Sequence, residues 1–169
     1  MAKKSTPKSR IDIDQFKCVW GILCSLSSID QEKNNVSLFN IIEQLNIPSA
    51  FFIEQQKKNT PLPVSFEFEI YLSLQRILDI AIFDEEIIND IKIKVIDPTN
   101  KIIQESLSQI LFPKAKKRFR FRLNFNGISL TTAGQYSILI ENKSQNKEQF
   151  KKLVEIPLEI NQSPLIKTN

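Results

Sequence analysis

The chain of 169 residues is long enough to bury one sizeable core, and its composition, 41% hydrophobic and 25% charged, is that of a globular protein. The absence of histidine excludes catalytic triads that need an imidazole and removes the commonest metal ligand. Three dispersed glycines cannot build a glycine-rich phosphate loop. A net charge of +4 does not by itself indicate nucleic-acid binding. We therefore expect a non-enzymatic protein with no metal and no cofactor.

The two ends of the chain differ in composition from its middle. Residues 1–12 are basic, so we expect a flexible N-terminal tail, then a single domain over residues 13–160 and a loose polar end over 161–169. The apolar run 19–26 resembles part of a signal peptide, but Asp12, Asp14 and Lys17 before it oppose that interpretation. No run approaches the roughly 18 apolar residues of a membrane helix. These features predict a cytoplasmic protein without a membrane span.

The first predicted strand, residues 16–26, is almost continuously apolar, as in a strand buried on both faces. Trp20 within it is predicted to be a core residue. Cys18 and Cys24 lie six positions apart, so on one strand they would share a face at roughly 20 Å, too far for a disulfide. Reduced thiols fit a cytosolic protein, and we interpret both as small buried hydrophobes. Residues 36–47 follow as a strand, or as a strand interrupted by a helical turn at 40–44.

A long connection follows, bracketed by Pro48, Pro61 and Pro63 and carrying Phe51 and Phe52. Long connections without structure of their own are often functional, and exposed aromatic side chains would anchor a partner protein. Alternatively, the two phenylalanines plug one end of the fold, or the connection holds a short strand.

Alternation of apolar and polar residues then predicts half-buried strands. In residues 64–75 one face carries Phe66, Phe68, Ile70, Leu72 and Leu74. A helix is conceivable over 76–88, where strand breakers are few. Next, Ile91, Ile93 and Val95 alternate with lysines, and the turn-forming residues 97–100 lead into a strand that begins near Ile102, which predicts a hairpin.

Cations and phenylalanines alternate in residues 116–125. Lys116, Arg118, Arg120 and Arg122 share one face, and the other carries Phe119, Phe121, Leu123 and Phe125. One interpretation is a solvated face balanced across strands by Glu67 and Glu69. The other is a patch for an anionic partner: an acidic protein, a nucleic-acid backbone or an anionic lipid. Nucleic-acid binding lacks support from interleaved aromatics, because these phenylalanines are expected in the core.

Two further strands close the chain. Tyr136, Ile138 and Ile140 share a face in the first, and residues 153–160 alternate in the second. Pro157 predicts an edge strand, because proline cannot donate to a ladder. Together these patterns predict an all-β protein, an antiparallel two-sheet sandwich of immunoglobulin-like style with about eight strands and at most one short helix.

The order of these segments resembles a family of uncharacterised bacterial β-sandwich proteins known as a domain of unknown function. The resemblance covers about residues 16–160 and rests on the segments SLFNIIEQLNIPS, FEIYLSL, IKVIDPTNKII, RFRLNFNGISL, GQYSILIE and VEIPLEI. It implies an immunoglobulin-like or macroglobulin-like sandwich in a bacterial protein. It implies no activity and no functional residues.

We therefore expect a protein-interaction or accessory module that offers a basic strand face and a long hydrophobic loop to another protein. The first alternative is binding of nucleic acid or another polyanion through the Lys/Arg stripe, and the second is a structural assembly subunit. The oligomeric state stays open. The residues expected to contact a partner are Lys116, Arg118, Arg120, Arg122, Phe51 and Phe52.

Overall fold

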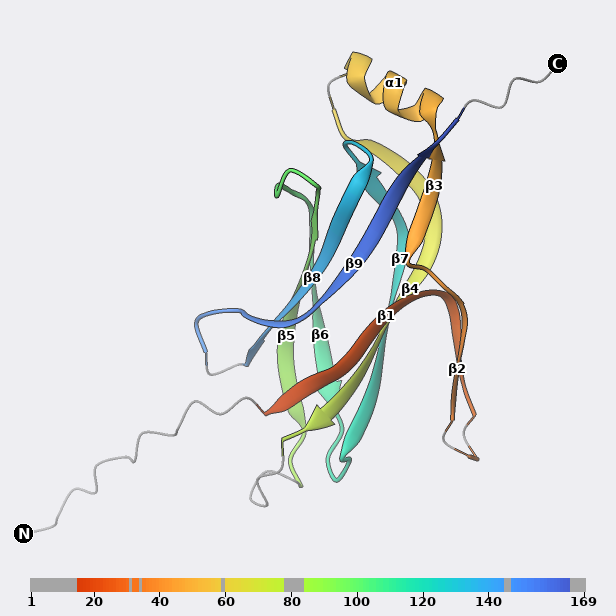
Figure 1. Cartoon of the computed structure of the whole chain (residues 1–169). Coiled ribbons are helices and arrows are strands. Elements are labelled where there is room, and N and C mark those ends of the chain that lie inside the picture. The colour runs from red at the N-terminus through yellow and green to blue at the C-terminus, as the bar shows by residue number, and fades with distance from the viewer. Residues whose placement is uncertain are drawn as a thin grey trace, which may run out of the picture.

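The computed structural model describes residues 15–30, 32–33, 35–58, 60–77, 84–144 and 147–164 (Figure 1). The basic segment 1–12 and residues 165–169 lie outside this part. Nine strands and one helix make up the described chain, in the order β1 (Phe16–Ile29), β2 (Val36–Ile41), β3 (Gln44–Pro48), α1 (Ser49–Lys58), β4 (Leu62–Arg76), β5 (Ile87–Ile96), β6 (Ile102–Phe112), β7 (Arg118–Leu130), β8 (Gly134–Ser144) and β9 (Lys151–Ser163).

The strands form two sheets packed as a sandwich, which confirms the predicted all-β class. One sheet has the order β2-β1-β4-β7 and the other β3-β9-β8-β5-β6. The successions β1-β4-β7 and β9-β8-β5-β6 correspond to the A-B-E and G-F-C-C′ strands of an immunoglobulin-like fold. The sandwich is not wholly antiparallel, because β3 pairs in parallel with β9.

The core lies between the sheets and consists of the apolar faces that alternation predicts. Buried side chains of β4 and β7 lie side by side on the inner surface of one sheet, and the inward residues of β5 and β8 form the opposite wall. The phenylalanine face of β7 points inward as expected, with Phe125 buried and Phe119, Phe121 and Leu123 packed against the core. This burial is the main source of stability in such a domain.

A bulge in β1 overturns the prediction that this strand is buried on both faces. Cys18 pairs with Leu74 and Trp20 pairs with Ser73, so Val19 is an extra residue that shifts the register. The shift turns Trp20 away from the core, where its side chain is 39% exposed, and the prediction of a core residue is wrong. It also puts Cys18 and Cys24 on opposite faces of β1, because Cys24 pairs with Glu69.

A second bulge keeps β7 in contact with the core along its whole length. The register between β4 and β7 shifts between Val64 and Glu67, opposite Gly127. Gly127 has φ 128°, and a Cβ there would lie 2.8 Å from the Val64 carbonyl oxygen, so only glycine fits without strain. Beyond it Ile128 and Leu130 face inward, whereas before it the inward residues are odd-numbered.

The connection after β3 is a helix, not the loop predicted from its prolines. Pro48 ends β3, and Ser49 opens α1 while its Oγ donates to the Ser163 carbonyl at 2.5 Å. A Lys58–Glu54 ion pair at 2.6 Å supports the last turn. The helix lies at one end of the molecule, close to the end of β3 (Figure 1). Phe52 is buried in the core cluster and Phe51 packs against it, so the two plug an end of the sandwich.

Four other predictions differ from the structure, wholly or in part. Residues 36–47 contain two strands and no helical turn, because Asn40 takes a left-handed φ of 49° and the chain changes sheets after Ile41. The conceivable helix over 76–88 is absent from its described residues: Arg76 ends β4 and Ile87 begins β5. Strand β9 continues to Ser163, past the expected boundary at 160. Pro157 lies on a stretch of β9 that pairs only with β8; β3 joins from Glu159 onward, so β9 is an edge strand over only part of its length.

Polar side chains tie the loops at one end of the sandwich together. The Asp97 carboxylate accepts hydrogen bonds from Thr99 and from the Lys101 backbone, which closes the β5–β6 turn. Its second oxygen accepts from the Thr131 hydroxyl at 2.9 Å. The Tyr136 hydroxyl accepts from two backbone amides of the β7–β8 turn and donates to the Thr132 carbonyl at 2.7 Å, an arrangement known as a tyrosine corner.

We predict that neither cysteine reacts with an alkylating reagent in the folded protein. Burial raises the pKa of Cys18 to about 11, against an opposing hydrogen bond at Trp20, and burial together with the charge of Glu69 raises the pKa of Cys24. Only the thiolate is nucleophilic, so at pH 7.5 iodoacetamide is expected to label both thiols after denaturation and neither before it. Mass spectrometry measures the adducts. Rapid labelling of the native protein would contradict the burial of Cys24 and the partial burial of Cys18.

Candidate functional site

The outward surface of the four-stranded sheet carries large apolar side chains next to cations. We call this surface, made by the outward residues of β1, β2, β4 and β7, the mixed face. Cross-strand pairing fixes its neighbours, because directly opposed residues point to the same side of a sheet. On β1 and β2, Leu26 pairs with Phe39 and Cys24 with Ile41. Trp20, Leu26, Phe39 and Ile41 are 39%, 54%, 48% and 55% exposed, so this half of the face is apolar and open to solvent.

Trp20 lies over Tyr71 at the centre of the mixed face. Their rings stack with centroids 5.0 Å apart and an interplanar angle of 19°. Tyr71 is fully buried although it points outward from β4, and its hydroxyl has no hydrogen-bond partner among the described residues. Burial raises the pKa of Tyr71, while the nearby charges of Arg120 and Arg122 act in the opposite direction. The stack therefore forms a rigid aromatic platform beside two cations.

Three arginines of β7 form the cationic half of the mixed face. Rows run across three strands: Trp20, Ser73 and Arg120 form one. The next row contains Ile22, Tyr71 and Arg122. Arg118 follows opposite Gln75 and is exposed, as is Arg122, whereas Arg120 is partly buried. Lys116 lies in the turn before β7, so it is exposed beside the stripe and does not belong to the strand face as predicted.

The register shows that Glu67 and Glu69 do not lie across from the arginines. They pair with Asn126 and Asn124, so the prediction that these two carboxylates balance the arginines directly across strands is wrong. Glu69 instead accepts from the backbone amide of Ser27 at 2.9 Å and from its hydroxyl. Arg122 Nη1 donates to the Ser27 carbonyl at 3.3 Å. Through these hydrogen bonds Ser27 links the C-terminal end of β1 to both β4 and β7.

The outward surface of the five-stranded sheet is balanced in the way expected for a solvated face. Its lysines lie near carboxylates, as in Lys94–Glu141 at 2.7 Å and Lys92–Glu105 at 3.4 Å. Lys92 and Lys143 also lie over the Phe150 ring, 4.7 and 5.0 Å from its centroid. On this sheet cations and anions alternate across strands, whereas on the mixed face the arginines of β7 pair with Gln75, Ser73 and Tyr71 of β4, and none of the three lies directly opposite a carboxylate. The contrast singles out the mixed face.

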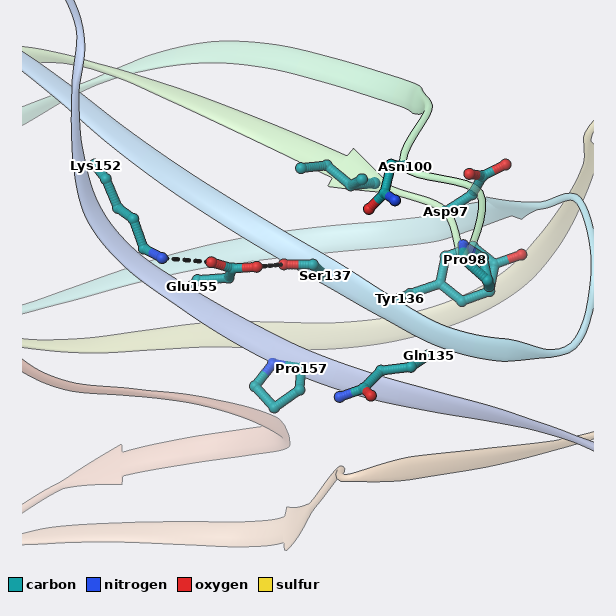
Figure 2. A pocket seen from close by; sticks show the side chains of 10 residues that line it. Asp97, Pro98, Asn100, Gln135, Tyr136, Ser137, Lys152, Glu155 and Pro157 are labelled. Carbon is teal, nitrogen blue, oxygen red and sulfur yellow. Dashed lines mark hydrogen bonds and ion pairs between the residues drawn. The ribbon is translucent and has the colours of Figure 1, made fainter.

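A groove of about 500 Å³ lies between the β5–β6 turn, β8 and β9 (Figure 2). Glu155 dominates its polar lining: Lys152 and the Ser137 hydroxyl both donate to it at 2.5 Å (Figure 2). These hydrogen bonds lower the pKa of Glu155. Asp97 on the turn side is likewise occupied by bonds to its own loop. Since Lys152 and Glu155 bond to each other and Asp97 bonds to its own loop and to Thr131, the groove offers little to a ligand. Within the described residues, no three cysteine or carboxylate side chains gather as metal ligands.

The structure separates the six residues expected at a partner site. Arg118, Arg120 and Arg122 lie together on the mixed face, and Lys116 lies near them. Phe52 is buried and Phe51 partly buried at the end of the sandwich, so neither provides the exposed anchor that was one interpretation of that segment. The apolar half of the mixed face was missed: the assumption that residues 16–26 are buried on both faces hid Trp20 and Leu26. Phe39 and Ile41 join them only through the β1–β2 pairing, which the sequence pattern did not indicate.

Comparisons leave the family open. No protein-family model matches the sequence, and no curated protein matches it. The resemblance to bacterial sandwich proteins therefore stays a prediction. No helix in the described part of the chain is long and apolar enough to cross a bilayer.

Proposed function

We propose that this protein is a non-enzymatic interaction module whose mixed face binds a partner protein through a segment that carries acidic and apolar side chains. The observation that carries the proposal is the register across β1, β4 and β7, which puts Trp20 and Ile22 in rows with Arg120 and Arg122. A partner segment lying along these strands would bury apolar groups on one half and pair carboxylates with the other.

The apolar half supports a protein partner. Contiguous exposed apolar patches on soluble domains mark interaction sites more often than single exposed residues do. Leu26, Phe39 and Ile41 adjoin one another by strand pairing, and Trp20 continues the row along β1. Tryptophan and arginine are also the residue types that dominate binding energy at protein interfaces. A sheet face that carries both types in one row has the composition of an interface centre.

Nucleic acid is the second candidate, and the observation that favours it is the row that contains both Trp20 and Arg120. Single-stranded nucleic acids stack bases on exposed aromatics next to cations. However, one face of the Trp20 ring already stacks on Tyr71, and the nearby apolar side chains include the aliphatic Leu26 and Ile41, which do not stack on bases. The net charge of +4 is also small for a polyanion binder. These features favour the protein partner.

A cytoplasmic location in a bacterial cell is part of this proposal. Cys18 and Cys24 form no disulfide and point to opposite faces of β1, which fits a reducing compartment.

Selection from a random peptide display library tests the proposal. We expect the protein to enrich peptides that combine Asp or Glu with Leu, Ile or aromatic residues. The triple variant Arg118→Glu, Arg120→Glu, Arg122→Glu is expected to weaken binding of a selected peptide at least about 100-fold, because three attractions become repulsions. Fluorescence anisotropy of the labelled peptide measures the affinity.

Controls distinguish the two candidates. Lys94→Glu reverses one charge on the outward surface of the other sheet and is expected to leave peptide affinity unchanged. A labelled single-stranded oligonucleotide is titrated in parallel at low and moderate salt. Binding of the oligonucleotide with steep salt dependence, together with no enrichment of acidic peptides, would replace the protein partner by nucleic acid.

A further inference from the structure

The four outer edges of the two sheets differ in how they are protected from pairing with another strand. An unpaired edge presents free backbone donors and acceptors, and soluble proteins cover such edges with charge, proline or brevity. Strands β2 and β3 are six and five residues long, and β3 ends in Pro48. Strand β7 is long but carries Arg118, Arg120 and Arg122. Strand β6 is the least protected of the long edges, because its devices are one charged residue, Glu105, and a register shift near its start.

Strand β6 is an open, apolar edge of eleven residues. Its sequence, IIQESLSQILF, contains no proline and one charged residue, Glu105. Leu107 is 68% exposed, the highest exposed fraction of the large hydrophobic residues in the described chain, and Leu111 is 49% exposed. Ile88 of β5 pairs with Leu111 and is also exposed, so an apolar strip follows the edge. Strand β6 pairs with β5 along one side, and no described strand pairs with β6 along its other side.

The sequence of β6 is complementary to itself about Leu107. A two-fold axis through this residue would pair two copies of β6 antiparallel with like faces aligned over residues 104–110; the register shift of β6 at Ile103 lies outside this segment. Leu107 would oppose Leu107 of the second copy, and Glu105 would oppose Gln109, an acceptor opposite an amide donor. On the inward side Ser106 would oppose Ser108. No like charges meet, and the outward centre of the contact is apolar.

On the long edge of the other sheet, the cationic segment of β7 opposes such pairing. Antiparallel pairing of two β7 strands about Arg120 would place Arg120 opposite Arg120 and Arg118 opposite Arg122. Directly opposed like charges destabilise a strand pair. The cationic segment of β7 therefore repels a second copy paired about Arg120, whereas no like charges meet along β6.

We propose that two copies of this chain pair through β6 to form a dimer whose five-stranded sheets join into one continuous ten-stranded sheet. Strand addition supplies backbone hydrogen bonds along β6, and the Leu107 contact specifies the register. The dimer leaves the mixed face free, since that face belongs to the other sheet. The inference therefore goes beyond the proposed function and does not depend on it.

Analytical ultracentrifugation of the purified chain tests the proposal. The wild type is expected to sediment as a dimer of two 19.6 kDa chains, with a dissociation constant on the order of micromolar for an interface of one strand. Leu107→Lys puts two ammonium groups opposite each other at the axis and is expected to weaken the dimer at least about tenfold. The matched control Leu26→Lys changes an equally apolar, exposed residue on the mixed face and is expected to leave the dimer intact.

The two variants also separate this inference from the proposed function. Leu107→Lys is expected to bind a selected peptide normally, and Leu26→Lys is expected to bind it weakly. A monomer at every concentration up to about a hundredfold above that micromolar dissociation constant, or a polydisperse aggregate in place of a dimer, would overturn the inference. So would a dimer that both variants leave unchanged.

Cysteine cross-linking tests the register. Directly opposed Cα atoms in an antiparallel pair lie about 4.5–5.5 Å apart, within the range of a disulfide. Leu107→Cys is therefore expected to give a covalent dimer on mild oxidation. Gln109→Cys is the control, because the two-fold axis separates its two copies by roughly 13 Å along the strand. Equal cross-linking of both variants would contradict the register. Cys24 is buried and Cys18 partly buried, which keeps the background from the native thiols low.

Discussion

Replacing Arg76 with alanine is expected to lower the free energy of unfolding by about 3–5 kcal/mol. Arg76 has the largest fully buried side chain of the described protein. Its Nη2 donates to the carbonyl oxygens of Glu85 and Pro113, each at 2.9 Å, and its guanidinium lies 5.1 Å from the centroid of the Phe112 ring. Alanine would leave a cavity and two carbonyls without this donor. The expected fall in Tm is roughly 6–20 °C, measured by circular dichroism.

Two further variants identify which part of the Arg76 side chain matters. Arg118→Ala removes an exposed arginine of β7 and is expected to change stability by less than about 0.5 kcal/mol. Arg76→Met fills much of the volume and keeps contact with Phe112 but cannot donate, so we expect it to recover only part of the loss. If Arg76→Met were as stable as the wild type, the hydrogen bonds to the two carbonyls would contribute nothing net.

The core of the sandwich follows from alternation because a half-buried strand obeys a simple rule with a period of two. Strands β4, β5, β7 and β8 were predicted with the correct inward faces, since polar residues between the apolar ones fix the face. The rule fails at β1, where polar residues are too few to mark the outward side and one extra residue, Val19, reverses the parity. It also fails at Arg76, which has the inward parity of Leu72 and Leu74 but a charge that pattern arguments assign to solvent.

Alternation was likewise insufficient to predict the whole of the mixed face. The arginine stripe was predicted because strict alternation places its side chains together. Its apolar half depends on which strands are neighbours, since Leu26 and Phe39 adjoin only through the β1–β2 pairing. The helix α1 had local indications: Pro48 and Ser49 at its start, lysines in its last turn and Pro61 after it. These indications were missed because the prolines were interpreted only as loop residues.

Asp97→Ala is expected to lower the free energy of unfolding by about 2–4 kcal/mol, because the buried carboxylate joins two turns. Thr99 and Lys101 of its own turn donate to one oxygen, and Thr131 of the β7–β8 turn donates to the other. Alanine would leave these donors without their acceptor next to the tyrosine corner of Tyr136. Chemical denaturation measures the loss. Asp84→Ala, which removes an exposed carboxylate, is the control and is expected to have almost no effect.

The pH dependence of stability tests the same carboxylate independently. Burial alone would raise the pKa of Asp97, but the hydrogen bonds from Thr99, Lys101 and Thr131 outweigh it and hold the pKa below its usual 3.8. A lowered pKa in the folded state means that the unfolded state binds a proton first as the pH falls. The contribution of Asp97 is therefore complete above about pH 5 and is lost progressively below about pH 4. The variant Asp97→Asn cannot titrate, so its stability is expected to be lower at neutral pH and to decline less steeply in acid than that of the wild type. Equal acid slopes for the two proteins would show that the charge of Asp97 does not stabilise the junction of these turns.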